Sequence, residues 1–261
     1  MTQNYFLYHA GCEDGFASAL VPWQIFGSDA KYIPVSHGDP PPQLPANASV
    51  VITDFSYKRD TILNIADSVE KLVILDHHQT AQEELRNLDF AHFDMEKSGA
   101  TLSWEYWHPD QPTPDLFLYV EDRDLWKFQL DNSTEINAAI TSYPFDFEIW
   151  NNFDISKLAI EGIHISRSIR QQVVRIADRA MMQMISGYEV PVVNTSTHAS
   201  DILDELCKRY PKAPFAACFY DNGRGERRWS LASAENFDVG TLARELGGGG
   251  HYHRSGFLEK Y

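Results

Sequence analysis

Three short segments in the first third of the chain carry side chains that bind metal ions. They contain His9 with Cys12, Glu13 and Asp14, then Asp54, and then Asp76-His77-His78. Imidazole combined with carboxylate suits Mn, Fe or Zn, whereas Ca prefers ligands that are all oxygen. An aspartate lying between two ions could bridge them through its two oxygens. The residue types therefore predict a site for divalent cations.

Each segment also has a simpler interpretation. A histidine such as His9 at a strand end is more often structural than catalytic, and Asp54 could cap the helix that follows it. The triplet Asp76-His77-His78 is harder to explain in this way, because three adjacent titratable groups after an apolar stretch are costly to bury unless they are solvated or liganded. Taken together, the three segments favour a metal site over three separate coincidences.

Two further motifs contain candidate functional residues. Asp122 lies in the stretch YVEDRDLW beside Arg123 and Asp124, which by itself is typical of a charged helix end. The run Gly247 to Gly250 is followed by His251. Consecutive glycines allow backbone N–H groups to approach an anion closely, and a histidine can add a donor. A flexible loop is the alternative, but we favour phosphate binding.

The elements that would position these residues alternate between strand and helix. Apolar runs predict strands at 5–10, 31–36, 49–55, 71–78 and 88–94, with helices at 14–26, 59–69, 98–107, 114–126 and 134–143. This order predicts an α/β fold whose mostly parallel sheet has helices on both faces. Such sheets bind ligands at the carboxyl ends of their strands, where His9, Asp54 and Asp76 would lie.

The remainder of the chain predicts a second, smaller α/β domain. An amphipathic run over 155–186 is expected to form a long helical connection. Strand and helix patterns then resume, ending in a last strand over 255–260. We therefore expect a metal-binding domain at 1–150, a helical linker at 151–187 and a substrate-binding domain at 188–261.

Composition limits the possible environments. The chain has 261 residues, 43% of them hydrophobic, and we find no apolar run near the roughly 18 residues that a membrane span needs. The first residues, MTQNYFLYHA, do not resemble a signal peptide. The three widely spaced cysteines suit a reducing cytoplasm better than a disulfide framework.

Net charge limits the possible partners. The formal net charge is −15, and residues 188–261 contribute little of it, with 9 lysines and arginines against 10 aspartates and glutamates. A long nucleic acid needs many basic contacts to its phosphates, so we expect none as a partner. An acidic enzyme can still bind a small phosphorylated substrate if metal ions reverse the local charge. Solubility alone is the alternative explanation of the acidity.

The motifs, taken in order, resemble the DHH phosphoesterase superfamily. The matching stretches are HAGCEDGFASA at 9–19, ITDFS at 52–56, ILDHH at 74–78, SGATL at 98–102, EDRD at 121–124 and GGGGHYHRSGF at 247–257. The last stretch resembles the glycine-rich signature of the DHH-associated domain. The two-domain layout is similar to nanoRNases and related phosphodiesterases, and it lacks the length of RecJ-type exonucleases.

The resemblance implies two divalent ions, usually Mn²⁺, with Fe²⁺, Co²⁺ or Zn²⁺ as alternatives. By resemblance, the metal ligands are His9, Cys12, Asp14, Asp54, His77 and Asp122, with Asp54 shared between the ions. Asp76 would orient the neighbouring imidazoles, and His78 would face the scissile phosphate. By resemblance, the substrate contacts are Ser98, Arg123, Gly249, Gly250 and His251.

Two positions depart from the family pattern. Cys12 stands where many relatives have an aspartate; a thiolate there would bias the site toward Fe or Zn, unless it does not bind metal. Ala232, in Ser-Leu-Ala-Ser, stands where an arginine is common, and a nearby arginine such as Arg227, Arg228 or Arg254 could compensate for it.

The resemblance implies hydrolysis of short oligonucleotides or linear dinucleotides to mononucleotides. We hypothesise in-line attack by a hydroxide that two metal ions activate, with His78 stabilising charge or protonating the leaving oxygen. A substrate cleft between two domains would favour short chains. The alternatives are an exopolyphosphatase or pyrophosphatase, and a catalytically silent nucleotide-binding protein. The residues leave RNA, DNA and linear dinucleotides open as substrates, and they do not indicate an oligomeric state.

Overall fold

The computed structural model describes residues 3–36, 38–234 and 236–261. The chain divides into two compact units, Met1–Ser166 and Arg167–Tyr261. The first is built on a parallel sheet flanked by helices and the second on a mixed sheet, which confirms the predicted α/β class. The boundary between the two units falls inside one long helix, α8 (Ile155–Ala177).

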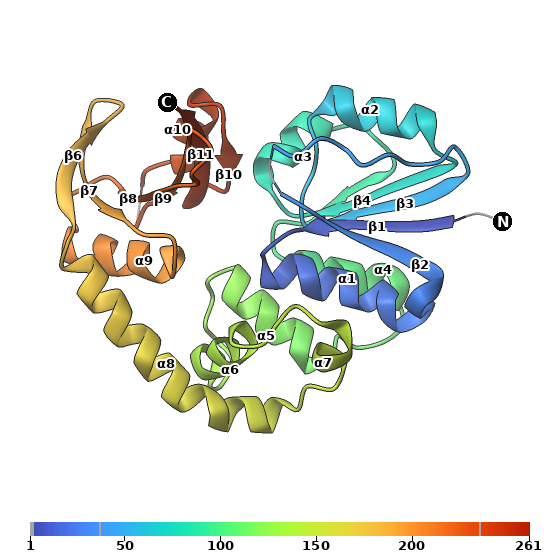
Figure 1. Ribbon diagram of the computed structural model, residues 1–261, viewed down its shortest axis with the longest axis horizontal. Helices are drawn as coiled ribbons and strands as arrows, with labels where there is room; N and C mark the ends of the chain where they lie inside the picture. The colour runs from blue at the N-terminus through green and yellow to red at the C-terminus, as the bar shows by residue number, and fades with distance from the viewer. Residues whose placement is uncertain (1–2, 37, 235) are drawn as a thin grey trace. The chain divides into compact units, whose positions relative to one another are not determined.

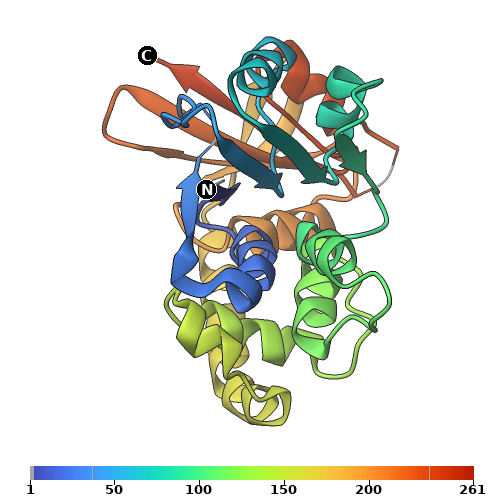
Figure 2. The same cartoon turned by 90° about the vertical axis from the view of Figure 1, so that its right-hand side faces the viewer.

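The first unit contains a five-stranded sheet in which every neighbouring pair is parallel. The strand order is β2-β1-β3-β4-β5. In chain order the strands are β1 (Gln3–His9), β2 (Ala30–Val35), β3 (Ala48–Thr53), β4 (Lys71–Asp76) and β5 (Ala91–Phe93). Figures 1 and 2 show this sheet in two views.

Helices cover both faces of this sheet (Figure 1). The helices of the first unit are α1 (Glu13–Phe26), the 3₁₀ turn η1 (Gly27–Asp29), α2 (Arg59–Ser68), α3 (Gln79–Leu85), α4 (Gly99–Trp107), α5 (Asp115–Asp124), α6 (Ser133–Thr141), α7 (Phe147–Asn151) and the start of α8. Helices α1 and α4 lie on one face, and α2 and α3 lie on the other.

The central strands are apolar at nearly every position because both faces are buried. In β3, Val50 and Ile52 pack with Ile62 of α2 in one core. Val51, between them, points to the opposite face and packs with residues of α1 and α4. The continuous apolar run in the sequence is therefore explained by two cores that share one strand.

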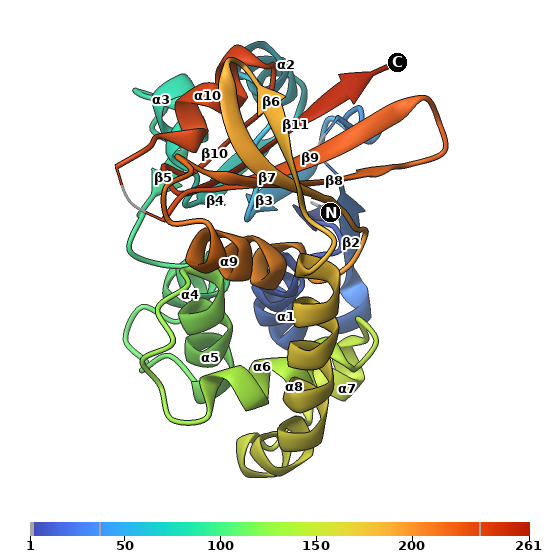
Figure 3. The same ribbon diagram turned by 90° about the vertical axis from the view of Figure 1, so that its left-hand side faces the viewer.

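The second unit contains a six-stranded mixed sheet in the order β10-β11-β9-β8-β7-β6. Its strands are β6 (Met181–Ile185), β7 (Tyr188–Asn194), β8 (Ala216–Asp221), β9 (Glu226–Ala232), β10 (Gly249–Gly250) and β11 (Arg254–Lys260). Helix α9 (Ala199–Arg209) packs on one face and α10 (Val239–Glu245) on the other, as Figure 3 shows.

The structure corrects the prediction of one helix over 155–186. Helix α8 ends at Ala177, and Met181–Ile185 instead forms the edge strand β6, paired with β7. Ser186 and Gly187 connect the two strands with φ values of 47° and 86°. Two consecutive positive φ angles suit the tight turns that join antiparallel strands. Four short elements of the described ranges, η1, α3, α7 and β10, were not predicted. Within the described ranges, every helix is too short or too polar to cross a bilayer.

Candidate metal centre

The strand register brings the candidate residues to one edge of the first sheet. Tyr8 of β1 pairs with Thr53 of β3, and Thr53 pairs with Leu75 of β4. The residues that follow these three are His9, Asp54 and Asp76, so they lie in one row at the carboxyl ends of the strands. Parallel pairing therefore gathers residues that are far apart in sequence, as predicted.

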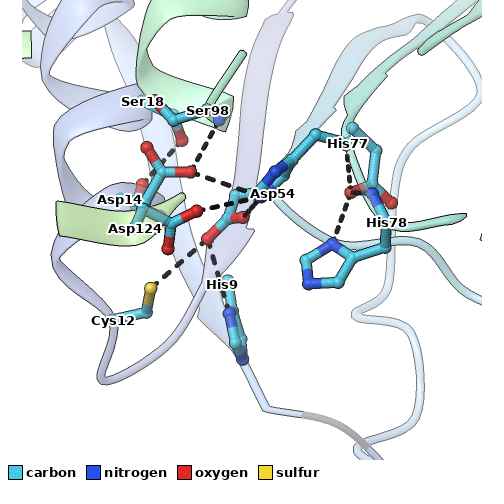
Figure 4. Close-up of polar contacts among 12 residues, drawn as sticks. His9, Cys12, Asp14, Ser18, Asp54, His77, His78, Ser98 and Asp124 are labelled. Atoms are coloured by element: carbon cyan, nitrogen blue, oxygen red, sulfur yellow. Dashed lines mark hydrogen bonds and ion pairs between the residues drawn. The ribbon is translucent and has the colours of Figure 1, made fainter. Parts of the chain in front are cut away.

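Asp54 lies at the centre of this row (Figure 4). Its Oδ1 is 3.0 Å from Nε2 of His77. Its Oδ2 is 3.4 Å from Nδ1 of His9 and 3.5 Å from Sγ of Cys12. Asp54 has a φ of 58°, a left-handed conformation that aspartate tolerates better than most residues. The two carboxylate oxygens therefore face two different groups of donors.

The first donor group is formed by His9, Cys12 and Asp54, and the second by Asp14, His77 and Asp124. Within each group, one possible ligand atom from each residue lies within 4.8 Å of the others. Nε2 of His77 is 3.7 Å from Oδ2 of Asp14 and 3.5 Å from Oδ2 of Asp124. The donor types and separations fit one divalent cation in each group, with Asp54 between them.

Asp14 is held in place by the start of α4. Backbone N–H groups of Gly99 and Ala100 donate to its Oδ2 and Oδ1 at 2.6 and 2.9 Å. A Cβ at Gly99 would lie 2.6 Å from Cβ of Asp54 and 2.9 Å from Oδ2 of Asp14, so only glycine fits. The positive end of the helix dipole also favours a carboxylate here.

The structure gives Ser98 a structural role at the start of α4. Ser98 is fully buried and is the N-cap of α4, where its hydroxyl accepts a hydrogen bond from the Thr101 backbone N–H. Serine at this position satisfies a free N–H of the first helical turn. Ser98 therefore fixes the helix end that binds Asp14, and its contact with a substrate stays a prediction.

Asp122 also differs from the prediction. Its carboxylate is buried and accepts hydrogen bonds from the backbone N–H groups of Gln129 and Leu130, at 2.8 and 3.3 Å. Asp124, two residues further along, faces His77 instead. Two helical residues are rotated by about 200°, so they cannot both point to one site. The resemblance assigned this role to Asp122, because the letters of EDRD do not show which aspartate faces the site.

Asp76 positions both histidines that follow it. Its buried Oδ1 accepts from the backbone N–H groups of His77 and His78, at 2.8 and 3.2 Å, and lies 2.7 Å from Nδ1 of His78. Its Oδ2 accepts from the Ser56 hydroxyl at 2.6 Å. Asp76 thus orients the ring of His78 directly, whereas it orients His77 through the backbone.

The charges in the centre are tightly packed. Burial, together with the nearby charges of Asp54 and Asp124, raises the pKa of Asp14 well above its usual value. Burial likewise raises the pKa of Asp124. For His77, burial alone would lower the pKa, but the hydrogen bond to Asp54 and the surrounding carboxylates outweigh it and raise the pKa to about 10. A cluster of carboxylates that resists ionisation is one that a cation would stabilise.

Asp54 and the Cys12 thiol are shifted in opposite directions by the same surroundings. Burial alone would raise the pKa of Asp54, but hydrogen bonds with His77 and His9 outweigh it and hold that pKa well below its usual value. Burial, followed by the charge of Asp54, raises the pKa of the Cys12 thiol. Asp54 is therefore the carboxylate of this cluster that remains charged most readily without metal.

The Asp76–His78 contact leads to a first prediction. We expect Asp76→Asn to lower the rate of metal-dependent catalysis at this centre by about 10- to 100-fold, the usual cost of losing a residue that orients a functional group. Bound metal should stay near the wild-type amount, because Asp76 orients His77 only through the backbone. Steady-state kinetics and mass spectrometry of bound metal measure the two effects. Equal loss of metal and activity would contradict the positioning role.

The remaining predicted contacts lie elsewhere. The guanidinium carbon of Arg123 is 4.6 Å from the ring centre of Trp126 and 5.5 Å from that of Phe128. Arg123 therefore stacks on aromatic rings at the end of α5, which does not place it among the donors of the metal centre. Its predicted contact with substrate stays a prediction.

The glycine run belongs to the second unit and is not a flexible loop. Gly249 and Gly250 form β10 and pair with Gly256 and Ser255 of β11. A Cβ at Gly250 would lie 2.6 Å from the carbonyl oxygen of Arg254, so close strand packing requires glycine there. The backbone N–H of His251 donates to the same carbonyl at 2.7 Å. Phosphate binding by this segment stays a prediction.

Ala232, predicted to stand where an arginine is common, lies beside an arginine of the neighbouring strand. Ala232 is fully buried and lies opposite Arg254 in the β9–β11 register. The Arg254 guanidinium donates to the Ser200 carbonyl at 3.2 Å and lies 3.8 Å from Oδ1 of Asp204. Arg254 is thus the arginine nearest in register to the altered position.

Comparison with known sequences gives a relative that matches nearly the whole chain. No protein-family model matches the chain. The uncharacterized protein R106 of Acanthamoeba polyphaga mimivirus is 28% identical over 278 residues, covering 96% of this chain. The chain spans 66% of the length of that curated relative.

Two solved structures match over nearly the whole chain. The pGpG-specific phosphodiesterase PggH from Vibrio cholerae gives a TM-score of 0.52 at 11% identity, covering 99% of this chain and 94% of its own. An exonuclease RecJ bound to manganese gives a TM-score of 0.51 at 13% identity, covering 98% and 85%. At such identities the likeness establishes the fold, which agrees with the resemblance of the motifs to the DHH superfamily.

Proposed function

We propose that the chain is a metal-dependent phosphodiesterase of the DHH superfamily, which hydrolyses short oligonucleotides or linear dinucleotides to mononucleotides. The observation that carries the proposal is the carboxylate of Asp54, whose two oxygens face separate groups of donors. The fold shared with a phosphodiesterase and an exonuclease supports the same reaction class.

Two divalent ions would be held in this centre. His9, Cys12 and Asp54 would hold one, and Asp14, Asp54, His77 and Asp124 the other. We propose Mn²⁺ as the usual ion, with Fe²⁺, Co²⁺ or Zn²⁺ also compatible with these donors. When bound, such ions supply an activated water at neutral pH and neutralise charge on the phosphoryl oxygens.

His78 is suited to protonate the leaving oxygen. Burial alone would lower its pKa, but the charge of Asp76 and the hydrogen bond to that carboxylate outweigh burial and raise the pKa. The ring therefore holds its proton more strongly at neutral pH than a free histidine does. Because Asp76 binds Nδ1, the Nε2 side of the ring is the one that can deliver a proton to substrate.

The acidity of the chain supports a short substrate. Apart from residues 188–261, it contains 13 lysines and arginines against 27 aspartates and glutamates. A long polyanion would meet strong repulsion from such a surface, whereas a dinucleotide presents few phosphates for the metal ions to neutralise.

We propose that the glycine run and His251 contribute a contact to a substrate phosphate.

A substrate panel in Mn²⁺ tests the proposal. We expect mononucleotides from di- to pentanucleotides, little product from long single strands, and no reaction after chelation of the metal. Chromatography of the products separates this outcome from the alternatives. Cleavage of pyrophosphate or short polyphosphate without cleavage of dinucleotides would indicate a phosphoanhydride hydrolase. Tight dinucleotide binding without turnover in any of several metals would indicate a silent binding protein.

A further inference from the structure

The two donor groups beside Asp54 differ in chemistry. Apart from Asp54, the group on its Oδ2 side contributes an imidazole from His9 and a thiol from Cys12. The group on its Oδ1 side contributes one imidazole and two carboxylates, from His77, Asp14 and Asp124. One side is therefore partly soft, and the other offers a harder set of oxygen and nitrogen donors.

Two separations in the thiol-bearing group match those expected around one tetrahedral ion. Bonds of about 2.1 Å to oxygen and nitrogen and about 2.3 Å to sulfur place an O···N pair about 3.4 Å apart and an O···S pair about 3.6 Å apart. Oδ2 of Asp54 is 3.4 Å from Nδ1 of His9 and 3.5 Å from Sγ of Cys12. Both separations measured from Asp54 thus fit a tetrahedral ion, and the ligand atoms of all three residues lie within 4.8 Å of one another.

The backbone fixes Cys12 in this position. It is the N-cap of α1, with extended angles of φ −126° and ψ 135°, and its carbonyl accepts from the Phe16 backbone N–H at 3.0 Å. Cys12 is the one cysteine in the first unit, because Cys207 and Cys218 belong to the second unit. The thiol is therefore placed by the fold at the metal centre.

We propose that Cys12 makes the centre a mixed-metal site. The position formed by His9, Cys12 and Asp54 selects Fe²⁺, Zn²⁺ or Co²⁺, because thiolate ligands favour these ions over Mn²⁺. The position formed by Asp14, Asp54, His77 and Asp124 binds Mn²⁺ or Mg²⁺. This inference rests on the proposed function, which requires metal in both positions, and it adds the identity of the ion in each.

Cobalt absorption tests the inference without measuring activity. Metal-free protein, kept anaerobic and reduced, is titrated with Co²⁺. We expect a thiolate-to-cobalt charge-transfer band in the near ultraviolet that saturates at one equivalent, together with visible d–d absorption. Cys12→Ser should lose the near-ultraviolet band and keep d–d absorption. Cys207→Ser is the matched control, since Cys207 packs in the core of the second unit, and it should keep both.

Metal content after dialysis tests the selectivity. With equimolar Zn²⁺ and Mn²⁺, we expect the wild-type protein to retain one of each, and Cys12→Asp to retain more Mn²⁺. The Zn²⁺ affinity of Cys12→Asp should fall by at least about tenfold. Loss of a residue that only hydrogen-bonds to a metal ligand already lowers metal affinity by this much.

The outcomes separate the two proposals. Strong d–d absorption from two cobalt ions without a charge-transfer band would leave the proposed metal enzyme intact and overturn the role of Cys12. Unchanged metal selectivity in Cys12→Asp would do the same. Absence of any cobalt binding would overturn the metal-dependent function itself.

Discussion

Asp54→Asn is expected to lower the hydrolysis of a dinucleotide by at least about 10³-fold, or about 4 kcal/mol of barrier. Asp54 contributes an oxygen to each donor group, so one substitution weakens both metal positions. Asparagine is the suitable replacement, because it tolerates the left-handed backbone at φ 58°, where alanine would add strain. The loss of activity should therefore reflect the missing carboxylate and not a misfolded chain.

The measurement combines kinetics in saturating Mn²⁺ with the amount of bound metal. Asp67→Asn is the matched control. Asp67 is exposed on α2, so this substitution removes the same charge but from the surface. That control should keep wild-type activity and metal content. Activity of Asp54→Asn within about tenfold of the wild type would show that Asp54 does not bridge two ions.

Replacing Asp122 or Asp124 by asparagine should have different effects on activity and on stability. Asp124→Asn is expected to reduce activity by about 10²-fold or more, as removal of a group that stabilises reacting charge does. Asp122→Asn should retain metal but lose about 1–3 kcal/mol of stability, because its buried carboxylate satisfies two backbone N–H groups. The family motif alone would assign these effects the other way round.

The pH dependence of the metal-free protein distinguishes the two aspartates further. The pKa of Asp124 is raised in the folded state, so its charge destabilises the fold above that pKa. Asp124→Asn should therefore increase the free energy of unfolding at neutral pH. The gain should shrink as the pH falls and the wild-type carboxyl takes up its proton. Thermal unfolding across pH measures this, and a destabilised metal-free Asp124→Asn would contradict the arrangement.

The sequence predicted that His9, Asp54 and Asp76 would share one edge of the sheet, because strand ends follow directly from apolar runs. His9, Asp54 and Asp76 each come at the end of such a run, and parallel pairing then brings them together. Helical residues were harder to assign. Choosing Asp124 over Asp122 requires the rotation of α5 and the course of the loop after it, neither of which the letters contain.

Other differences have similar physical causes. Ser98 was predicted to contact substrate, but the N-cap of a buried helix needs the same residue type. The helix expected over 155–186 ends at Ala177, because the apolar spacing of Met181–Ile185 also suits a strand. The turn at Ser186 and Gly187 favours the strand, since it lets Met181–Ile185 pair with β7. The glycine run was predicted to bind phosphate, and close packing against β11 separately accounts for the missing side chains at Gly248 and Gly250.

The most direct measurement is an anomalous difference map at the manganese edge, from crystals of the whole chain grown with Mn²⁺ and containing both units. We predict an ion between Asp54, His77, Asp14 and Asp124. We predict a second ion at the other oxygen of Asp54, beside His9 and Cys12, identified at its own absorption edge. A well-ordered map in which Asp54 contacts no ion, or in which Asp122 replaces Asp124 as a ligand, would contradict the proposed metal centre.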